Sequence, residues 1–246
     1  MPTPRFYHPH KLGPGTEVAL SAAAAHHAAR VLRMQAGDAV VLFDGNGGEY
    51  PAVLTRVAKS EVAAKTGTWR AAERESPLPV TLAQGIAAGD KMDFILQKAG
   101  ELGVARIQPL AMQRSVVKLS GERAQKRVEH WQGVVIAACE QCRRNRVPPV
   151  LPAMPLDVWL AETQPGTKLL LSPDAETALA ALPRPQGALT LLIGPEGGLA
   201  PEERKLALTQ GYTAVRLGPR VLRTETAALA ALAAMQALWG DFSHDN

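Results

Sequence analysis

Short apolar runs alternate with charged, amphipathic stretches over the last two thirds of the chain. Two of the runs, "TKLLLS" (167–172) and "LTLLIG" (189–194), have unbroken apolar centres, as expected of strands that are covered on both faces. The stretch "PEERKLALTQG" (201–211) is expected to form a helix that ends at its glycine. The alternation predicts an α/β fold with a parallel sheet flanked by helices. Further strands are expected at 78–85, 104–110 and 213–218, and further helices at 90–103, about 120–143 and 224–239.

The first part of the chain has a different pattern, mostly of short strands. Residues 39–57, "AVVLFDGNGGEYPAVLTRV", predict two strands joined by a glycine-rich turn, and 61–69 predict a third. One helix is expected around 26–34, so this part is predicted to be a small β-barrel. The stretch "RAAERESPLP" (70–79) is charged, has no large apolar residue before Leu78 and contains two prolines, which favours a linker. The predicted boundaries are a barrel domain at 1–72, a linker at 73–79 and a second domain at 80–246.

Three loops leave the carboxyl ends of predicted parallel strands, which is where open α/β sheets bind ligands. They are "LSPDAE" from Leu171, "IGPEGGL" after Leu192 and "LGPRVLRTET" after Val215. Glycine has no Cβ, so a ligand can approach the backbone closely. The alternative is a plain strand-to-helix connection, because Pro201 suits the first helical position, although Ala200 is a poor N-cap. Both interpretations stay open on residue chemistry alone.

Familiar nucleotide and metal motifs are absent from the sequence. There is no G-x-x-x-x-G-K-[ST], and no G-x-G-x-x-G opens a helix, which disfavours a triphosphate or a dinucleotide. Cys139 and Cys142 form C-x-x-C without a second cysteine pair, and His130 is more than two helical turns away. Structural zinc takes four ligands, so no metal site is expected.

Composition and charge narrow the class of protein. Of 246 residues 46% are hydrophobic and 20% charged, an ordinary globular balance. The net charge is +4, but 111–150 alone hold eight Lys and Arg against three Asp and Glu. This concentration favours an anionic partner, with a solvated basic helix face as the alternative.

The ends of the chain carry no targeting or membrane signal. The start, "MPTPRFYHPH", lacks the pattern of a secretory signal. The apolar run Ala227–Leu238 is shorter than the about 20 residues of a membrane span. Only two cysteines are present, so a cytoplasmic protein without a membrane partner is expected. The last helix is apolar all round, which predicts burial on all sides, and a second copy of the chain at a dimer interface is the favoured cover.

Several segments together resemble the RsmE family of SPOUT-class methyltransferases, which modify N3 of one uridine in small-subunit ribosomal RNA. The resemblance is carried by "IGPEGGLAPEE" (193–203) and "LGPRVLRTETAALAAL" (217–232), and by "QKAGELGVARIQPL" (97–110) and "AACEQCRRNRVP" (137–148). "PRFY" and "HHAARVLRMQAGD" match its opening, so coverage is essentially end to end. Ala200, Gln97 and Arg143 depart from the residues common in the family.

The resemblance implies more than the pattern does. It implies S-adenosylmethionine bound at a C-terminal trefoil knot, a homodimer with each cofactor site near the dimer interface, and a PUA-like RNA-binding barrel before the methyltransferase domain. The reaction requires uridine N3 to lose its proton, and a cation would stabilise the resulting anion. Arg223 is the candidate for this catalytic role, and an ion pair with Glu225 or Glu196 is the structural alternative for it. The general base is left open, with Glu140 as a third carboxylate in the matching motifs.

Binding residues follow from the same resemblance. The cofactor is expected to contact Leu171, Ser172, Gly194, Glu196, Gly197, Gly198, Leu217, Gly218, Leu222, Thr226 and Ala227. RNA is expected to contact Arg5, His27, Arg30 and Arg33 from the barrel, and Arg114, Lys118, Arg144 and Arg146, each with surface solvation as its alternative.

The resemblance implies methylation of 16S ribosomal RNA, with the assembled small subunit as the expected substrate. Two other functions remain open at this stage. One is a non-catalytic RNA-binding or ribosome assembly factor that keeps the fold, and the other is a SPOUT methyltransferase that acts on transfer RNA. The intact cofactor loops favour an enzyme, and the match over the barrel favours ribosomal RNA.

Overall fold

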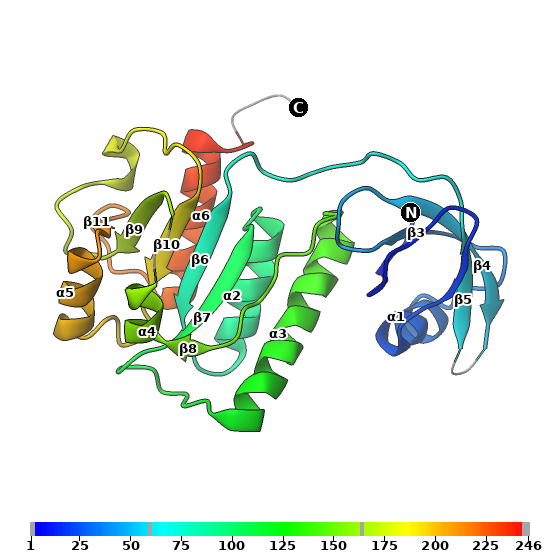
Figure 1. Cartoon of the computed structure of the whole chain (residues 1–246), viewed down its shortest axis with the longest axis horizontal. Coiled ribbons are helices and arrows are strands. Elements are labelled where there is room, and N and C mark those ends of the chain that lie inside the picture. Colours follow the sequence, from blue (N-terminus) through cyan, green and yellow to red (C-terminus); the bar gives the residue numbers. More distant parts are fainter. Residues whose placement is uncertain (1–2, 59–60, 163–164, 243–246) are drawn as a thin grey trace. The chain divides into compact units, whose positions relative to one another are not determined.

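The computed structural model describes residues 3–58, 61–162 and 165–242, and it divides the chain into two compact units. The first unit comprises Met1–Glu75 together with Cys139–Val147, and the second comprises Ser76–Ala138 and Pro148–Asn246. Figure 1 labels the elements of both. The segment Cys139–Val147 belongs to the first unit although the sequence predicted it within the second.

The first unit is a small curled sheet with one short helical segment. Its strands lie in the order β1-β3-β4-β5-β2, with β1 parallel to β3 and the other pairs antiparallel. Phe6, Leu42, Leu54 and other apolar side chains fill its core. The elements are β1 (Arg5–Tyr7), β2 (Glu17–Ala19), α1 (Ala22–His26), η1 (His27–Val31), β3 (Ala39–Phe43), β4 (Tyr50–Val57) and β5 (Val62–Thr66).

The helical segment differs from the prediction at 26–34. It begins earlier, at Ala22, because the Ser21 hydroxyl oxygen accepts a hydrogen bond from Ala24 N and caps the helix. It continues as a π-helical turn, in which Leu32 N donates to His27 O. The π-helical turn ends at Val31, and Arg33, two residues later, has a φ of +54°. The apolar spacing therefore located the helix but missed its capped start and its wider last turn.

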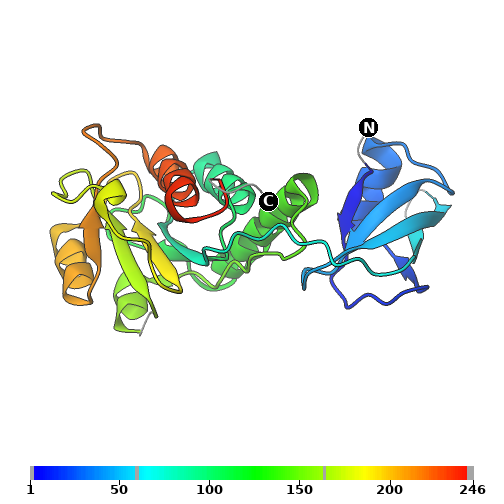
Figure 2. The same ribbon diagram turned by 90° about the horizontal axis from the view of Figure 1, so that it is seen from above.

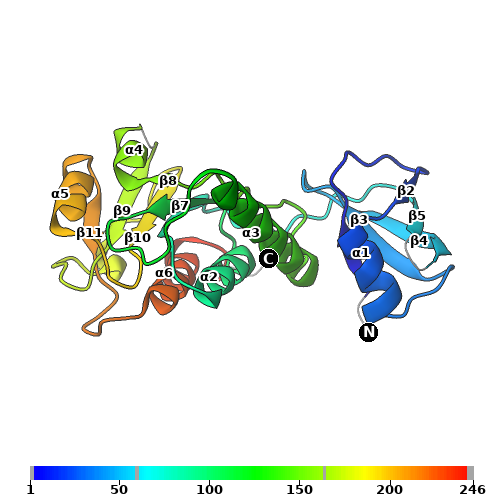
Figure 3. The ribbon, with the colours of Figure 1, turned by 90° about the horizontal axis from the view of Figure 1, so that it is seen from below.

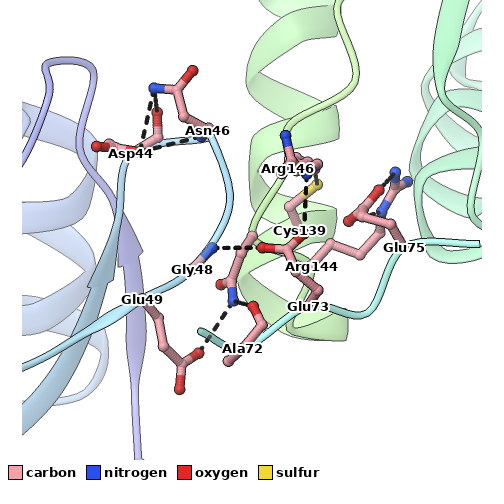
Figure 4. Close-up of polar contacts among 11 residues, drawn as sticks. Asp44, Asn46, Gly48, Glu49, Ala72, Glu73, Glu75, Cys139, Arg144 and Arg146 are labelled. Carbon is pink, nitrogen blue, oxygen red and sulfur yellow. Dashed lines mark hydrogen bonds and ion pairs between the residues drawn. The ribbon is translucent and has the colours of Figure 1, made fainter. Parts of the chain in front are cut away.

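Charged side chains join the segment Cys139–Val147 to the barrel within the first unit (Figure 4). Arg144 is 4% exposed and forms an ion pair with Glu75. Arg146 Nε pairs with Glu73 Oε2 at 3.0 Å, and Glu73 Oε1 accepts from Gly48 N at 2.6 Å. Asn145 donates to Ala72 O, which ties the segment to the chain that follows β5.

Arg5 and Glu49 complete this network on the barrel side. Arg5 Nη1 lies 2.6 Å from Glu49 Oε2, and both side chains are largely buried. Burial raises the pKa of Glu49, but the hydrogen bond and charge of Arg5 outweigh it, so the pKa is lowered overall. At Glu140 the effect of burial prevails, so the pKa of this carboxyl is raised. It is raised even though Tyr7 N donates a hydrogen bond to the carboxylate at 2.8 Å.

The second unit has the predicted α/β architecture. All strands of its sheet are parallel, in the order β11-β9-β10-β6-β7-β8. Helices α2, α3 and α6 cover one face and α4 and α5 cover the other (Figures 2 and 3). The elements are β6 (Val80–Gly85), α2 (Asp90–Glu101), β7 (Arg106–Ala111), α3 (Gly121–Cys142), β8 (Met154–Pro155), α4 (Leu156–Ala161), β9 (Thr167–Leu171), η2 (Leu179–Ala181), β10 (Leu189–Ile193), α5 (Pro201–Thr209), β11 (Thr213–Val215) and α6 (Thr224–Trp239).

Two predictions about the second unit are confirmed. Strand β10 is buried at every position, as its unbroken apolar run predicted. Helices α2 and α5 are followed by Gly103 and Gly211, whose φ values are +80° and +83°. Within the single chain, helix α6 leaves Ala237 exposed and Leu238 43% exposed, so the predicted burial of α6 on all sides requires a cover from outside the chain.

A glycine at the end of β6 permits a close backbone approach in the second unit. A Cβ built on Gly85 would lie 2.5 Å from Pro195 N and 2.9 Å from Gly194 C, which belong to the loop after β10. These are backbone atoms that cannot rotate away, so the loop packs directly on this residue. Position 85 therefore requires glycine for steric reasons.

We expect Gly85→Ala to lower the free energy of unfolding by about 1–3 kcal/mol, since the added methyl group overpacks a rigid contact. Denaturant titration of the whole chain measures this loss. Gly133→Ala is the matched control, because Gly133 lies in α3 with nothing within 4 Å of its built Cβ. The control should leave stability unchanged or raise it by up to about 1 kcal/mol. Equal effects at both positions would contradict the steric argument.

Candidate active site

The three loops singled out in the sequence meet at one rim of the sheet. Strands β11, β9 and β10 are parallel neighbours, so their carboxyl ends lie side by side. A cavity of about 350 Å³ opens between the loops that leave them. It is lined by residues 170–174 at the end of β9, 193–199 at the end of β10, 217 and 220–222 after β11, by Thr224 and Ala227 of α6, and by Arg114 and Arg204.

The three glycines of the loop after β10 serve different purposes. A Cβ on Gly194 would meet Gly198 C and Leu199 Cδ1 at 2.9 Å, and one on Gly197 would meet Arg114 Cβ at 2.9 Å. These two glycines therefore give room to the protein itself. Gly198 has φ +66° and nothing within 4 Å of its built Cβ, and it lines the cavity. The expectation that glycine opens the backbone to a ligand applies best to Gly198.

A buried polar cluster fixes the entrance of α6 to the same loop. The Thr224 hydroxyl donates to Gly194 O at 2.7 Å and accepts from Gln84 Nε2 at 3.0 Å. Gln84 is completely buried and Thr224 is 5% exposed. One side-chain cluster thus joins the end of β6, the loop after β10 and the start of α6. Gln84 and Thr224 were not predicted from the sequence, because nothing in their local pattern marks them.

A second set of hydrogen bonds joins the loops after β9 and β11. Arg216 donates through its backbone N to Thr177 O at 2.9 Å and through Nη1 to Ala175 O at 2.9 Å. Ser172 N donates to Val215 O at 2.9 Å. The walls of the cavity are therefore held together by backbone groups and one partly buried arginine contact, which makes the cavity a built feature of the fold.

Glu196 is held as a carboxylate at the edge of the cavity. Its Oε1 accepts from Ala88 N at 2.9 Å and lies 3.1 Å from Lys91 Nζ. Burial raises the pKa of Glu196, but the Ala88 and Glu196 N–H groups and the Lys91 ammonium outweigh it, so the pKa is lowered. Glu196 forms its ion pair with Lys91, so it is not the partner that was considered for Arg223. A lowered pKa also makes this carboxylate a poorer proton acceptor.

The helix after the loop replaces its missing side-chain cap. Ala200 offers no oxygen, but Glu203 Oε2 accepts from Ala200 N at 2.8 Å. Glu203 Oε1 accepts from Gln113 N at 2.8 Å, and Glu203 is 9% exposed. Glu203 therefore stabilises the start of α5 and also holds the segment 112–114. That segment presents Arg114, whose Nη1 donates to Gly197 O at 3.0 Å.

Most of the predicted cofactor residues line the cavity and two do not. Thr226 is exposed on α6, and Gly218, with φ +81°, shapes the loop after β11 without lining the cavity. Arg220, Asp174 and Arg204 line it although they were not predicted, because no apolar or glycine pattern marks them. Those brought together as predicted are Leu171, Ser172, Gly194, Glu196, Gly197, Gly198, Leu217, Leu222 and Ala227.

Arg223 lies beside the cavity, not in its wall. It is the exposed residue immediately before α6, and its neighbours Leu222 and Thr224 line the cavity. No carboxylate of the chain forms an ion pair with Arg223 within residues 3–58, 61–162 and 165–242. Glu225, its other considered partner, has one carboxylate oxygen buried without a hydrogen bond.

The predicted RNA-binding residues separate into two groups. Arg5 and Arg144 are bound in the buried ion pairs of the first unit, so the prediction that these two contact RNA is wrong. Their role is to hold the segment Cys139–Val147 on the barrel. The remaining six side chains belong to exposed residues, namely His27, Arg30, Arg33, Arg114, Lys118 and Arg146.

Cys139 and Cys142, near the end of α3, are not joined in a disulfide. The hydrogen bond with Cys142 and burial raise the pKa of the Cys139 thiol. Glu140, from the same turn, belongs to the first unit and does not line the cavity. Within the described residues, no helix has the length and apolar character needed to cross a membrane.

Comparison with known proteins gives the same assignment for both units. Residues 74–236 match the model of an RNA methyltransferase domain, and residues 20–66 match that of an RNA methyltransferase PUA domain. The chain is 33% identical to the ribosomal RNA small subunit methyltransferase E of Buchnera aphidicola over 98% of each chain.

Two solved structures share the whole fold. A ribosomal RNA small subunit methyltransferase E from Neisseria gonorrhoeae, bound to S-adenosylmethionine, has a TM-score of 0.93 at 46% identity, covering 98% of this chain and 99% of that one. A Legionella pneumophila protein with bound S-adenosylmethionine has a TM-score of 0.94 at 40% identity, covering 98% of this chain and all of the other. The loops, the cavity and these matches together place the chain in the family of ribosomal RNA small subunit methyltransferase E.

Proposed function

We propose that the protein is an S-adenosylmethionine-dependent methyltransferase that methylates N3 of one uridine in 16S ribosomal RNA. The cavity at the ends of β9, β10 and β11 carries this proposal. It has backbone walls, apolar side chains from Leu171, Leu217 and Leu222, and an open glycine at Gly198. Such a site suits a flat adenine and its ribose. Asp174 and Glu196 also line it, and carboxylates favour a positively charged sulfonium.

The residues of the chain have two tasks in this reaction. When bound, S-adenosylmethionine supplies a methyl group activated by its sulfonium. The loops hold the donor in one orientation, which brings the reacting atoms into line. The second task is to stabilise the uracil that has lost its N3 proton. We assign this to Arg223, whose exposed guanidinium lies at the N-terminus of the 16-residue helix α6, where the helix dipole also favours an anion.

No side chain is assigned as the general base. Glu196 has a lowered pKa and Glu140 does not line the cavity, so neither is suited to accept the N3 proton there. Solvent is the remaining acceptor once the uracil anion is stabilised. Such a protein works where ribosomes are assembled, and we assign it to the cytoplasm.

We further propose that the chain forms the trefoil knot implied by the family resemblance. Strand β11 lies at the edge of the sheet, next to β9, while Thr224 binds groups at the ends of β10 and β6. The segment 216–223 therefore passes over the ends of β9 and β10 before α6 begins. That crossing beside the loops is the path that a knotted C-terminus requires.

One assay tests the enzymatic proposal. Purified protein is incubated with labelled S-adenosylmethionine and small subunits that lack the modification, in parallel with free 16S RNA and with transfer RNA, and the product is mapped by mass spectrometry. We expect methyl transfer to a single uridine N3, with assembled subunits as the better substrate. Methylation of transfer RNA, or binding of subunits without transfer, would favour one of the two alternative functions.

Cofactor binding should depend on Gly198. We expect Gly198→Val to weaken the affinity for S-adenosylmethionine at least about tenfold, equivalent to about 1.4 kcal/mol, because the side chain projects into the cavity. Calorimetry measures the affinity. Gly187→Val is the control, since Gly187 has φ +80° and an open Cβ direction but lies outside the cavity. Similar losses for both variants would attribute the effect to backbone strain.

Catalysis should depend on Arg223. We expect Arg223→Ala to lower kcat by about 100-fold or more, the usual cost of removing one group that stabilises a developing negative charge. Its affinity for S-adenosylmethionine should stay within about threefold of the wild type, since Arg223 does not line the cavity. The exposed Arg184 provides the control variant Arg184→Ala. A near-normal kcat in Arg223→Ala would remove Arg223 from the mechanism.

We also propose that the protein is a homodimer that packs through α6. The helix leaves Ala230, Ala233, Ala234 and Ala237 partly or fully exposed, and Leu238 is 43% exposed. Small side chains of this kind let two helices approach closely.

We expect Leu238→Glu to convert a dimer into a monomer in sedimentation equilibrium, while Leu208→Glu, on the exposed face of α5, leaves the mass unchanged. A monomeric wild type would reject the proposal.

A further inference from the structure

One tryptophan of the chain is exposed and belongs to no core. Trp69 in the first unit is 48% exposed, whereas Trp131, Trp159 and Trp239 are at most 5% exposed. Large aromatic side chains are seldom left this open without a binding role, because their burial contributes strongly to stability. Trp69 lies outside the cavity at the strand ends and has no part in the reaction as derived above.

The indole of Trp69 is fixed against the backbone of a tight turn. A Cβ built on Gly48, whose φ is +68°, would lie 2.3–2.6 Å from Nε1, Cε2 and Cζ2 of Trp69. Glu49 N donates to Arg70 O at 3.0 Å and Arg70 N donates to Glu49 O at 2.8 Å, which pairs the two segments beside this contact. The ring therefore covers the glycine and keeps nearly half of its surface uncovered.

The ion pair of Arg146 and Glu73 lies against the neighbouring glycine of the same turn. A Cβ built on Gly47 would lie 2.7 Å from Glu73 Oε1 and 2.8 Å from Arg146 Nη2, so the guanidinium and the indole flank consecutive glycines. The Arg146 side chain is 57% exposed, and its ion pair with Glu73 uses Nε (Figure 4). The segments around the turn also expose Arg70, Arg74 and Arg143, against the single exposed carboxylate of Glu73.

We propose that Trp69 is a stacking platform for an unpaired RNA base, with Arg146 binding the adjoining phosphate. Stacking on an aromatic ring accepts any base, and arginine beside the ring neutralises the backbone, which is how proteins hold single-stranded RNA. A paired base is covered by its neighbours and does not present a free face. The proposal rests on the proposed function, because it takes the RNA substrate as the partner of this surface.

The wild-type chain carries its own probe for this contact. Trp69 is the one exposed tryptophan of four, so stacking should quench the exposed part of the intrinsic fluorescence and protect it from acrylamide. The ligand is a single-stranded RNA of about ten nucleotides, within the usual site size of such proteins, and a hairpin duplex of the same composition is the comparison. We expect saturable quenching with the single strand and little with the duplex.

Variants then measure the contribution of the ring. We expect Trp69→Leu to weaken binding of the labelled single strand about tenfold by anisotropy, within the range for loss of one stacked base. Trp69→Phe keeps a flat ring and should stay within about threefold of the wild type. Val53→Ala, which trims another exposed apolar side chain of the first unit, should bind normally. Thermal unfolding and S-adenosylmethionine affinity report whether each variant is folded.

Three results would overturn the proposal. They are Trp69 fluorescence that stays accessible in the RNA complex, normal RNA affinity in Trp69→Leu, and a Trp69→Leu defect confined to assembled subunits, which would point to a ribosomal protein. Failure of the proposed function looks different. Wild-type protein would then show no methyl transfer to subunits, whatever the fluorescence shows with RNA.

Discussion

The second unit depends on how closely the loop after β10 approaches the end of β6. Gly85 lets Pro195 and Gly194 rest on its backbone, and the Thr224 hydroxyl bridges Gly194 O and Gln84. These contacts are short, buried and made by groups with few alternative positions. They fix the loop after β10, which forms one wall of the cavity, against the end of β6. They also hold the start of α6 beside this loop. The cavity is therefore an outcome of backbone packing more than of side-chain choice.

The cavity combines backbone and apolar groups with five charged residues. The charged residues that line it are Arg114, Asp174, Glu196, Arg204 and Arg220. A site of this kind recognises the flat and apolar parts of a ligand through shape. Groups that act on a second substrate can then be supplied from the exposed ends of the loops. Arg223, exposed at the entrance of α6, fits such a division of roles.

The sequence predicted the second unit well because its elements are long and strongly patterned. Strands β9 and β10 and helices α2, α5 and α6 follow directly from apolar runs and terminal glycines. Strands β1, β2 and β8 have only two or three residues and exist through pairing with partners elsewhere. The π-helical turn after α1 depends on a shift in hydrogen bonding, to which apolar spacing is insensitive. Tertiary pairing decides such short elements.

The site was predictable where it consists of glycine and leucine near strand ends, and less so where it depends on contacts distant in sequence. Arg5 and Arg144 have the residue type expected of an RNA contact. Their side chains are instead buried in ion pairs with Glu49 and Glu75. Charge type alone does not separate a binding arginine from a structural one, because the difference lies in which carboxylate is nearby. Gln84 and Thr224 likewise acquire their role from the hydrogen bonds that join them to each other and to Gly194 O. No local sequence pattern predicts these bonds.

The discontinuous first unit has a consequence for dissecting this protein. Helix α3 begins in the second unit. Its last turn and the residues that follow, Cys139–Val147, belong to the first unit with the barrel. An isolated fragment ending at Glu75 would keep Arg5, Glu49 and Glu75 but lose Asn145 and Arg144. Glu75 would then lose its ion-pair partner, and Arg5 would lose the Asn145 acceptor while keeping Glu49. The barrel therefore cannot be expressed as one continuous segment with all its contacts. It is complete only when the end of helix α3 has also been synthesised.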